Sequence, residues 1–376
     1  NEVEYMSYVI ALGTAVPEFQ YSQEEIADSL IQKMQLEGTR EARKMKALYK
    51  LTRIKNRYSV LPDYRDNGHS PLLFSGETQE VPDVTQRMEV YREKVLPLAL
   101  SAVQNCLATL AGATSARESI THIISVSCTG MSAPGLEIAL AEKLGLRNDI
   151  VRFAVNFIGC YAAFHAMKIA HAVTQADPKA RVLIVCVELC TLHFQSKTDP
   201  DNMLANSLFG DGAAAIMVAG EQAAKDHSAK KLRMKGFQVE TLHAGKGDMT
   251  WDISQSGFLM RLSSYIPQLV EGGMRPLFDR LLENIQVDRS LIRYWGIHPG
   301  GKKILEACEK VLDIERESLE SSYEVLAEYG NMSSPTILFV LEHLWNEVFD
   351  WRQDQLILLA GFGPGLTLES AILEIA

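Results

Sequence analysis

Short apolar runs and longer helical segments alternate along the chain, and this alternation predicts an α/β fold. Most of the runs are rich in Val, Ile and Leu, as expected of strands buried on both faces. They predict strands at residues 8–15, 120–126, 151–157, 182–187, 213–218, 291–297 and 356–360. Long helices are expected at 85–111 and 161–174.

Cys160 stands between the strand predicted at 151–157 and the helix predicted at 161–174. That helix is apolar on nearly every side, so we expect it at the centre of a large fold. A thiol at a helix N-terminus feels the positive end of the helix dipole, which favours the thiolate and indicates a nucleophile. A small core residue is the other interpretation, because unpaired cysteines are among the most buried residues.

The second half of the chain repeats landmarks of the first half in the same order. Cys128 and His298 each follow an apolar strand and are 170 positions apart, while Cys160 and Asn331 each precede an apolar helix and are 171 apart. A nearly constant offset indicates an internal duplication. We therefore predict two related halves, residues 1–222 and 230–376.

A pseudo-two-fold arrangement of the halves brings Cys160, His298 and Asn331 to one buried place. A covalent thiol enzyme needs this combination, because it uses a nucleophile, a base and a neutral hydrogen-bond donor. Taken singly, His298 fits a core histidine and Asn331 fits a helix cap. Their symmetric placement favours the catalytic interpretation.

Composition narrows the class of protein. The chain has 376 residues, 47% of them hydrophobic, and a formal net charge of −10, which argues against nucleic acid as its main partner. No apolar run is long enough to cross a bilayer, so we expect no membrane span. The six cysteines form no CxxC pair and no zinc spacing, which predicts a cytoplasmic protein without a metal.

Five motifs in order give the chain a resemblance to the type III polyketide synthases, the chalcone and stilbene synthase superfamily. They are Gly159-Cys160, Ser207-Leu208-Phe209-Gly210-Asp211-Gly212, Gly296-Ile297-His298-Pro299-Gly300-Gly301, Glu328-Tyr329-Gly330-Asn331-Met332-Ser333-Ser334 and Gly361-Phe362-Gly363-Pro364-Gly365. The resemblance implies a thiolase-like five-layer αβαβα fold, a homodimer, and a Cys160-His298-Asn331 triad. It also implies condensation of a starter acyl-CoA with malonyl-CoA, with CoA thioesters as substrates and no cofactor.

The resemblance also assigns residues of the substrate pocket. Phe209 matches the gatekeeper between the CoA tunnel and the cavity, and Ser333 matches a cavity position linked to cyclisation. The loop of Gly361, Phe362, Gly363, Pro364 and Gly365 is expected to shape the cavity wall.

Four positions depart from the plant pattern or are only partly matched. Met260 replaces a second gatekeeper phenylalanine, Cys190 replaces a cavity threonine, and Ala133 replaces a methionine that the partner subunit inserts into the cavity. The segment around Cys190 resembles bacterial members that take fatty acyl starters. Of the basic CoA-binding positions only Lys44 is matched.

These residues predict a type III polyketide synthase that extends a fatty acyl starter and cyclises the product to an alkylpyrone or alkylresorcinol. A chalcone- or phloroglucinol-type synthase with another starter is an alternative. So are a β-ketoacyl synthase that initiates fatty-acid synthesis, hydroxymethylglutaryl-CoA synthase, and a non-catalytic relative. Incubation with malonyl-CoA and an acyl-CoA separates three of these classes. A polyketide synthase gives a product of several extensions, a β-ketoacyl synthase gives a single ketoacyl product, and a non-catalytic relative gives none.

Overall fold

The computed structural model describes residues 5–65, 72–74, 81–110, 113–225, 230–263 and 266–376. A nine-stranded sheet runs through it in the order β11-β12-β13-β8-β1-β7-β6-β4-β5. The first half supplies β1 (Ser7–Ala15), β4 (His122–Ser127), β5 (Val151–Asn156), β6 (Arg181–Leu189) and β7 (Asp211–Gly220). The second supplies β8 (Leu232–Thr241), β11 (Ile292–Ile297), β12 (Leu356–Gly363) and β13 (Thr367–Ile375).

The two halves order their strands identically. The order β1-β7-β6-β4 in the first half matches β8-β13-β12-β11 in the second. In each set the first two pairings are antiparallel and the last is parallel. The sets meet where β1 pairs with β8 over only a short stretch, from Ser7 to Val9. The internal repeat expected from the sequence is therefore present in the strand order.

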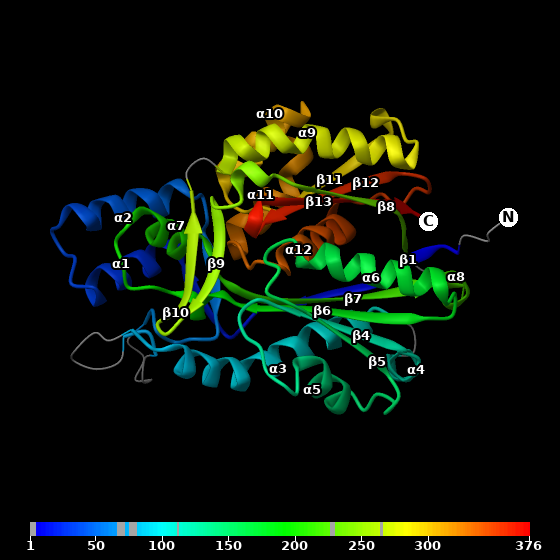
Figure 1. Ribbon diagram of the computed structural model, residues 1–376, viewed down its shortest axis with the longest axis horizontal. Helices are drawn as coiled ribbons and strands as arrows, with labels where there is room; N and C mark the ends of the chain where they lie inside the picture. The colour runs from blue at the N-terminus through cyan, green and yellow to red at the C-terminus, as the bar shows by residue number, and fades with distance from the viewer. Residues whose placement is uncertain (1–4, 66–71, 75–80, 111–112, 226–229, 264–265) are drawn as a thin grey trace.

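Five layers are visible in Figure 1. The helices α3 (Val84–Ala108) and α5 (Leu136–Lys143) cover the outer face of the first sheet portion, and α9 (Ile266–Ile285) and α10 (Lys302–Leu312) cover that of the second. Between the portions lie α6 (Ala162–Ala176) and α12 (Thr336–His343). This is the predicted αβαβα arrangement, and it places α6 at the centre as its apolar sequence requires.

The central layer is the best-buried part of the molecule. Phe164 of α6 and Leu338 of α12 belong to one apolar core with the inward faces of both sheet portions, among them Ile184 and Ile357. All four of these side chains have no solvent exposure. The loops that precede α6 and α12 are therefore anchored by rigid, close-packed elements.

The remaining elements flank one end of the layers, on the left of Figure 1. They are α1 (Gln23–Lys33), α2 (Arg40–Leu51), α7 (Pro200–Leu208), the β2–β3 pair (Phe19–Ser22 and Asn56–Ser59) and the β9–β10 hairpin (Met249–Ser254 and Gly257–Leu262). The other α-helices of the described residues are α4 (Ala113–Glu118), α8 (Glu221–Ala224) and α11 (Glu320–Tyr329).

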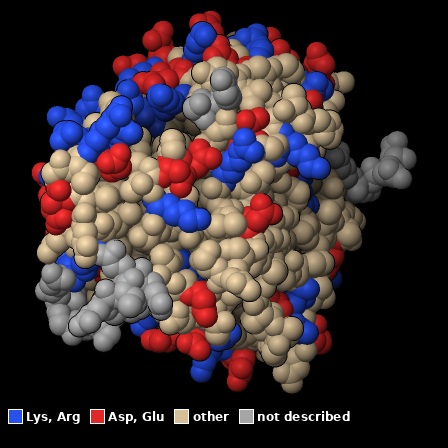
Figure 2. Space-filling view, turned by 60° about the vertical axis from the view of Figure 1, so that its left-hand side comes forward, with Lys and Arg blue, Asp and Glu red and all other residues tan. Residues whose placement is uncertain are grey.

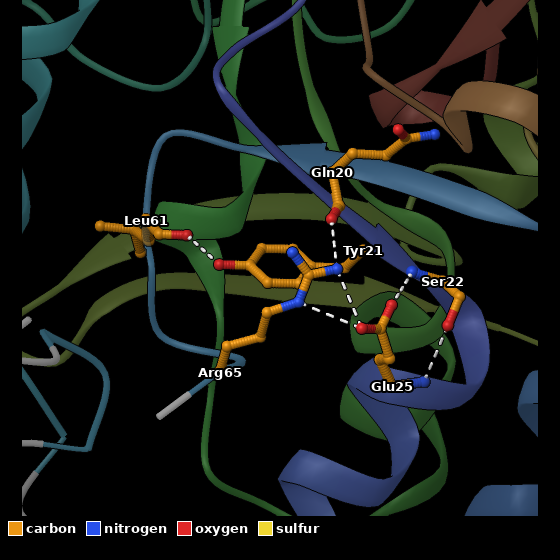
Figure 3. A network of polar contacts seen from close by, with 6 residues as sticks. All are labelled: Gln20, Tyr21, Ser22, Glu25, Leu61 and Arg65. Atoms are coloured by element: carbon orange, nitrogen blue, oxygen red, sulfur yellow. Dashed lines mark hydrogen bonds and ion pairs between the residues drawn. The ribbon is translucent and has the colours of Figure 1, made fainter. Parts of the chain in front are cut away.

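A local network fixes the start of α1 (Figure 3). The Ser22 hydroxyl accepts from the Glu25 backbone N–H at 3.1 Å, and the Glu25 carboxylate accepts from the Ser22 N–H at 2.7 Å. Such a reciprocal capping box satisfies two otherwise free N–H groups. Arg65 donates to the same carboxylate at 2.9 Å, and the Tyr21 hydroxyl donates to the Leu61 carbonyl at 3.0 Å. Ser22 therefore caps α1, which begins at Gln23.

Candidate active site

Cys160 lies in the turn between β5 and α6, and its surroundings fix the backbone there. Gly159 has a φ of +98°, a conformation that disfavours any residue with a side chain. A Cβ at this position would lie 2.3 Å from the Pro364 ring. The Gly159 N–H donates to the Cys128 sulfur at 3.0 Å. The glycine before Cys160 is thus required both by conformation and by the close approach of Pro364.

The electrostatic surroundings of Cys160 correct the sequence-based expectation of a thiolate. Burial raises the pKa of the thiol to about 11, while hydrogen bonding with Ser333 and Asn331 lowers it and the charge of Glu188 raises it. Desolvation is the largest of these contributions, so the pKa of the thiol lies above its ordinary value. Without substrate, the thiol is neutral at physiological pH.

His298 follows β11 and is completely buried. Its backbone N–H donates to the Ala360 carbonyl at 2.8 Å, and its ring meets Phe362 edge-on at 5.5 Å between ring centres. Among the described residues neither ring nitrogen has a hydrogen-bond partner, and burial lowers the pKa of the ring to about 3. The imidazole is therefore neutral and keeps both nitrogens available for a ligand.

Asn331 holds in the second half the place that Cys160 holds in the first. It is 2% exposed and lies in the loop between α11 and α12. Its side-chain oxygen accepts from the Ser333 N–H at 2.8 Å, so its amide group is oriented with the Nδ2 donor free of that bond. Nδ2 has a long contact of 3.5 Å to the Gly300 carbonyl, two residues after His298.

The end of β12 contacts two of the three predicted catalytic residues, His298 and Cys160. Phe362 packs on the His298 ring, and a Cβ on Gly363 would lie 3.1 Å from the backbone nitrogen of Cys160. Together with the interaction of Cys160 with Asn331, these contacts bring the triad of the sequence analysis to one place. The structure describes no direct bond between the Cys160 sulfur and the His298 ring within the ranges given above.

A cavity opens in front of the Cys160 thiol. Of the predicted pocket residues, Phe209, Met260, Ser333 and Pro364 line it. The sequence analysis did not identify the rest of its lining, which consists of Cys128, Phe157, Gly159, Met249, Thr250, Trp251 and Leu262. The cavity is strongly apolar, as small-molecule sites usually are.

The other predicted positions lie elsewhere. Cys190 is buried and lines an adjoining pocket, while Gly361 packs on Phe164 and the His298 Cβ. Ala133 is exposed at the surface and does not line the cavity of its own chain. Gly365 has a φ of +75°, so it supplies the turn into β13.

Glu188 is a functional candidate that sequence reasoning missed. This completely buried carboxyl at the end of β6 accepts hydrogen bonds from the Cys128 N–H at 2.8 Å, the Thr129 hydroxyl at 3.0 Å and the Ser334 hydroxyl at 2.8 Å. It therefore joins the two halves beside the triad. A charged residue that ends an otherwise apolar strand was the available signal.

Lys44 lies on the exposed face of α2. Figure 2 turns the side with α1 and α2 forward and shows Lys and Arg side chains gathered in its upper left part. Exposed residues of α2 include Arg43, Lys46 and Lys50, of which Lys46 pairs with Asp28 at 2.7 Å. A phosphate-bearing ligand fits such a basic surface.

The duplicated five-layer architecture is the thiolase-like fold, and a cysteine at the head of one central helix faces an asparagine at the head of the other. Comparison with family models identifies the family. The N-terminal domain model of the chalcone and stilbene synthases matches residues 3–222, and the C-terminal domain model matches residues 236–376. The chain belongs to this family and is a type III polyketide synthase, an acyl-transferring enzyme.

Known relatives span nearly the whole chain. Type III polyketide synthase A of Arabidopsis thaliana is 32% identical over 97% of this chain and 92% of its own length. The Mycobacterium tuberculosis protein named alpha-pyrone synthesis polyketide synthase-like Pks18 is 29% identical over 98% of this chain and 91% of its own.

Solved structures similar in sequence to this chain have the same fold. The brown-algal synthase PKS-I of Ectocarpus siliculosus superposes with a TM-score of 0.91 at 26% identity and covers both chains completely. CsyB, solved with CoA-SH, has a TM-score of 0.87 at 25% identity over 98% of this chain and all of its own.

Family members use CoA thioesters as substrates and work without a cofactor. Within the described ranges no cluster of His, Cys, Asp and Glu is arranged to hold a metal ion. The same part of the chain contains no helix that is both long and apolar enough to cross a membrane.

Proposed function

We propose that this synthase extends a fatty acyl starter with malonyl units on Cys160 and cyclises the product to an alkylpyrone or alkylresorcinol. The observation that carries the proposal is the apolar cavity in front of the thiol, whose lining includes the unbranched, adaptable side chains Met249 and Met260. The space left in it is small, so a long chain requires these methionines to move. The name of the Mycobacterium relative, which refers to alpha-pyrone synthesis, agrees with the proposal.

Loading begins when Cys160 attacks the carbonyl carbon of the starter thioester. Because thiol and imidazole are both neutral, the thiol proton passes to His298 as the C–S bond forms. The CoA thiolate leaves and takes up that proton, so His298 returns to its neutral form. The starter is then held as a thioester on Cys160.

Extension follows when malonyl-CoA loses carbon dioxide. The electron pair of the broken C–C bond then forms an enolate. The free donors of His298 and the Asn331 amide are placed to stabilise the enolate oxygen, because preorganised donors in a dry site favour developing charge. The enolate carbon attacks the Cys160 thioester carbonyl, a C–C bond forms, and the Cys160 thiolate is released. Returning the lengthened chain to Cys160 allows a further cycle.

A panel of starters tests the substrate class. Acyl-CoAs from acetyl to palmitoyl, together with coumaroyl-CoA, are incubated with malonyl-CoA, and products are identified by mass spectrometry. Each buried methylene contributes at most ~0.8 kcal/mol, so affinity rises with chain length until the cavity ends. The proposal is wrong if coumaroyl-CoA or acetyl-CoA is preferred to every fatty acyl-CoA. A product of a single extension indicates a β-ketoacyl synthase instead.

We also propose a homodimer that forms along β5. This strand is at the edge of the sheet and its first four residues are exposed, among them Val151 (45%) and Phe153 (36%). Ile138 of α5 and Met131 add exposed apolar surface. An uncovered apolar edge strand promotes association. Light scattering after size exclusion is expected to give twice the 41.8 kDa of the chain, and a monomer contradicts the proposal.

Three further expectations stay predictions. The division into residues 1–222 and 230–376 is one of them, and the cytoplasmic location, suggested by six free cysteines, is another. Binding of the CoA phosphates at Lys44 is the third. Lys44→Glu is expected to raise the KM for acyl-CoA with little effect on kcat, because the contact is remote from the reacting atoms.

A further inference from the structure

A buried carboxylate that the mechanism above does not use connects the two halves of the molecule. Glu369 of β13 has no solvent exposure. Its Oε1 accepts a hydrogen bond from the Lys168 ammonium at 2.6 Å and lies 3.1 Å from Nε2 of His165. Both partners belong to α6, which begins two residues after Cys160. β13 belongs to the other half, which carries the two remaining triad residues.

The register of β13 places Glu369 level with the catalytic residues. Glu369 pairs with Gly361 of β12. A Cβ on Gly361 would lie 2.7 Å from the Phe164 ring of α6 and 3.5 Å from the His298 Cβ. At this level α6, β12 and the catalytic histidine therefore meet. The carboxylate holds α6 against the second half beside the site and not at its remote end.

Tyr161 extends this contact to the nucleophile, since it is the next residue after Cys160. Its ring packs on the His165 ring with 5.4 Å between ring centres. A Cβ on Gly363 would lie 2.7 Å from the Tyr161 ring and 3.1 Å from the Cys160 backbone nitrogen. Tyr161 is thus packed between the end of β12 and a histidine that Glu369 holds. A shift of α6 away from β13 therefore moves the backbone of the nucleophile.

The buried charge of Glu369 makes this connection resist separation. Among the described residues its Oε2 has no hydrogen-bond partner. The compensation that the structure describes thus falls on Oε1, which faces Lys168 and His165, whose side chains are 29% and 35% exposed. Moving one partner of a buried ion pair away leaves the other charge without compensation, at a large cost in free energy. The pair therefore fixes α6 against β13.

We propose that the Glu369–Lys168 pair positions the Cys160 thiol for acyl loading. The inference rests on the proposed function, in which the thiol proton passes to His298 during loading. Loading therefore joins groups from both halves, and a small error in their alignment slows it. Malonyl decarboxylation uses His298 and Asn331, which both belong to the second half, so it does not need this connection.

The test compares the two half-reactions in one variant. Lys168→Met keeps an unbranched side chain and removes its charge. Loading of Cys160 from octanoyl-CoA, followed by mass spectrometry after rapid quenching, is expected to slow about tenfold or more. Release of carbon dioxide from malonyl-CoA alone is expected to stay within about threefold of wild type.

Two further single variants serve as rescue and control. Lys168→Arg keeps the ion pair with Glu369 and is expected to load within about threefold of wild type. Lys235→Met removes a lysine that pairs with Glu374 at 2.9 Å, a contact between β8 and β13 inside the second half. This matched change is expected to leave both rates unchanged.

A role in stability alone would give a different pattern. Lys168→Met leaves the Glu369 charge buried without its closest partner, so the Tm is expected to fall. A double variant, Lys168→Met with Glu369→Gln, removes that uncompensated charge, so its Tm is expected to recover while loading stays slow. Recovery of loading together with the Tm overturns the inference, as do equal losses of loading and decarboxylation in Lys168→Met.

Failure of the inference and failure of the proposed function are distinguishable. If wild type loads octanoyl-CoA on Cys160 and Lys168→Met loads it at the same rate, the inference alone is wrong. If wild type neither loads an acyl-CoA nor decarboxylates malonyl-CoA, the proposed function is wrong and the inference falls with it.

Discussion

Replacing Glu188 by Gln is expected to change how stability depends on pH. Burial raises the pKa of this carboxyl to about 7 from an ordinary 4.5, against the hydrogen bonds that it accepts. The difference corresponds to about 3 kcal/mol between the protonation states. Because the folded protein holds the proton more tightly, this stability is present below pH 4.5 and is lost as pH rises to about 7.

Urea unfolding of both proteins at pH 5 and pH 8 checks the reasoning. Wild type is expected to lose about 2.5 kcal/mol more than Glu188→Gln over this interval, because the unfolded carboxyl is already mostly ionised at pH 5. Burial also raises the pKa of Asp211, to about 6. This group changes the pH dependence of stability equally in both proteins, so its contribution cancels in the comparison. Equal losses in the two proteins would refute the argument.

Glu188→Gln is also expected to change the reactivity of Cys160. The Glu188 charge raises the pKa of the Cys160 thiol. Above pH 7, Glu188→Gln is therefore expected to alkylate faster at Cys160 than wild type.

Three further predictions concern the active site. Asn331→Ala is expected to slow malonyl decarboxylation about 100-fold, the usual effect of losing an oxyanion donor. It is expected to impair acyl loading less than His298→Ala does. Loss of loading with intact decarboxylation contradicts these roles. The iodoacetamide rate at Cys160 is expected to keep rising from pH 7 to 10, because burial raises its pKa to about 11; a plateau below pH 8, or a faster adduct on Cys128, contradicts this. Cys190→Phe is expected to shorten the longest accepted starter, and an unchanged starter profile excludes Cys190 from the acyl site.

The sequence predicted the elements that follow simple hydrophobic patterns. The strand expected at 291–297 is β11 (Ile292–Ile297), and the helix expected at 161–174 is α6 (Ala162–Ala176). The duplication was visible because apolar strands and helices recur at a fixed offset. β8 and β13 were not predicted, because charged residues such as Lys235 and Glu369 interrupt their apolar pattern.

The site was only partly predictable. Motif order identified Cys160, His298 and Asn331, but not the burial that raises the pKa of the Cys160 thiol. Burial of a charged residue depends on long-range packing, so Glu188 was not recognised. Tertiary structure alone brings Glu188 and Ser334 together, since 146 positions separate them.

The acyl-enzyme tests the central claim most directly. Wild type is incubated with octanoyl-CoA without malonyl-CoA, and the protein and its peptides are analysed by mass spectrometry. The account predicts one octanoyl group on Cys160, released by neutral hydroxylamine, consumed when malonyl-CoA is added, and absent in Cys160→Ala. An octanoyl group on Cys128 or Cys190, or products formed by Cys160→Ala, would contradict it.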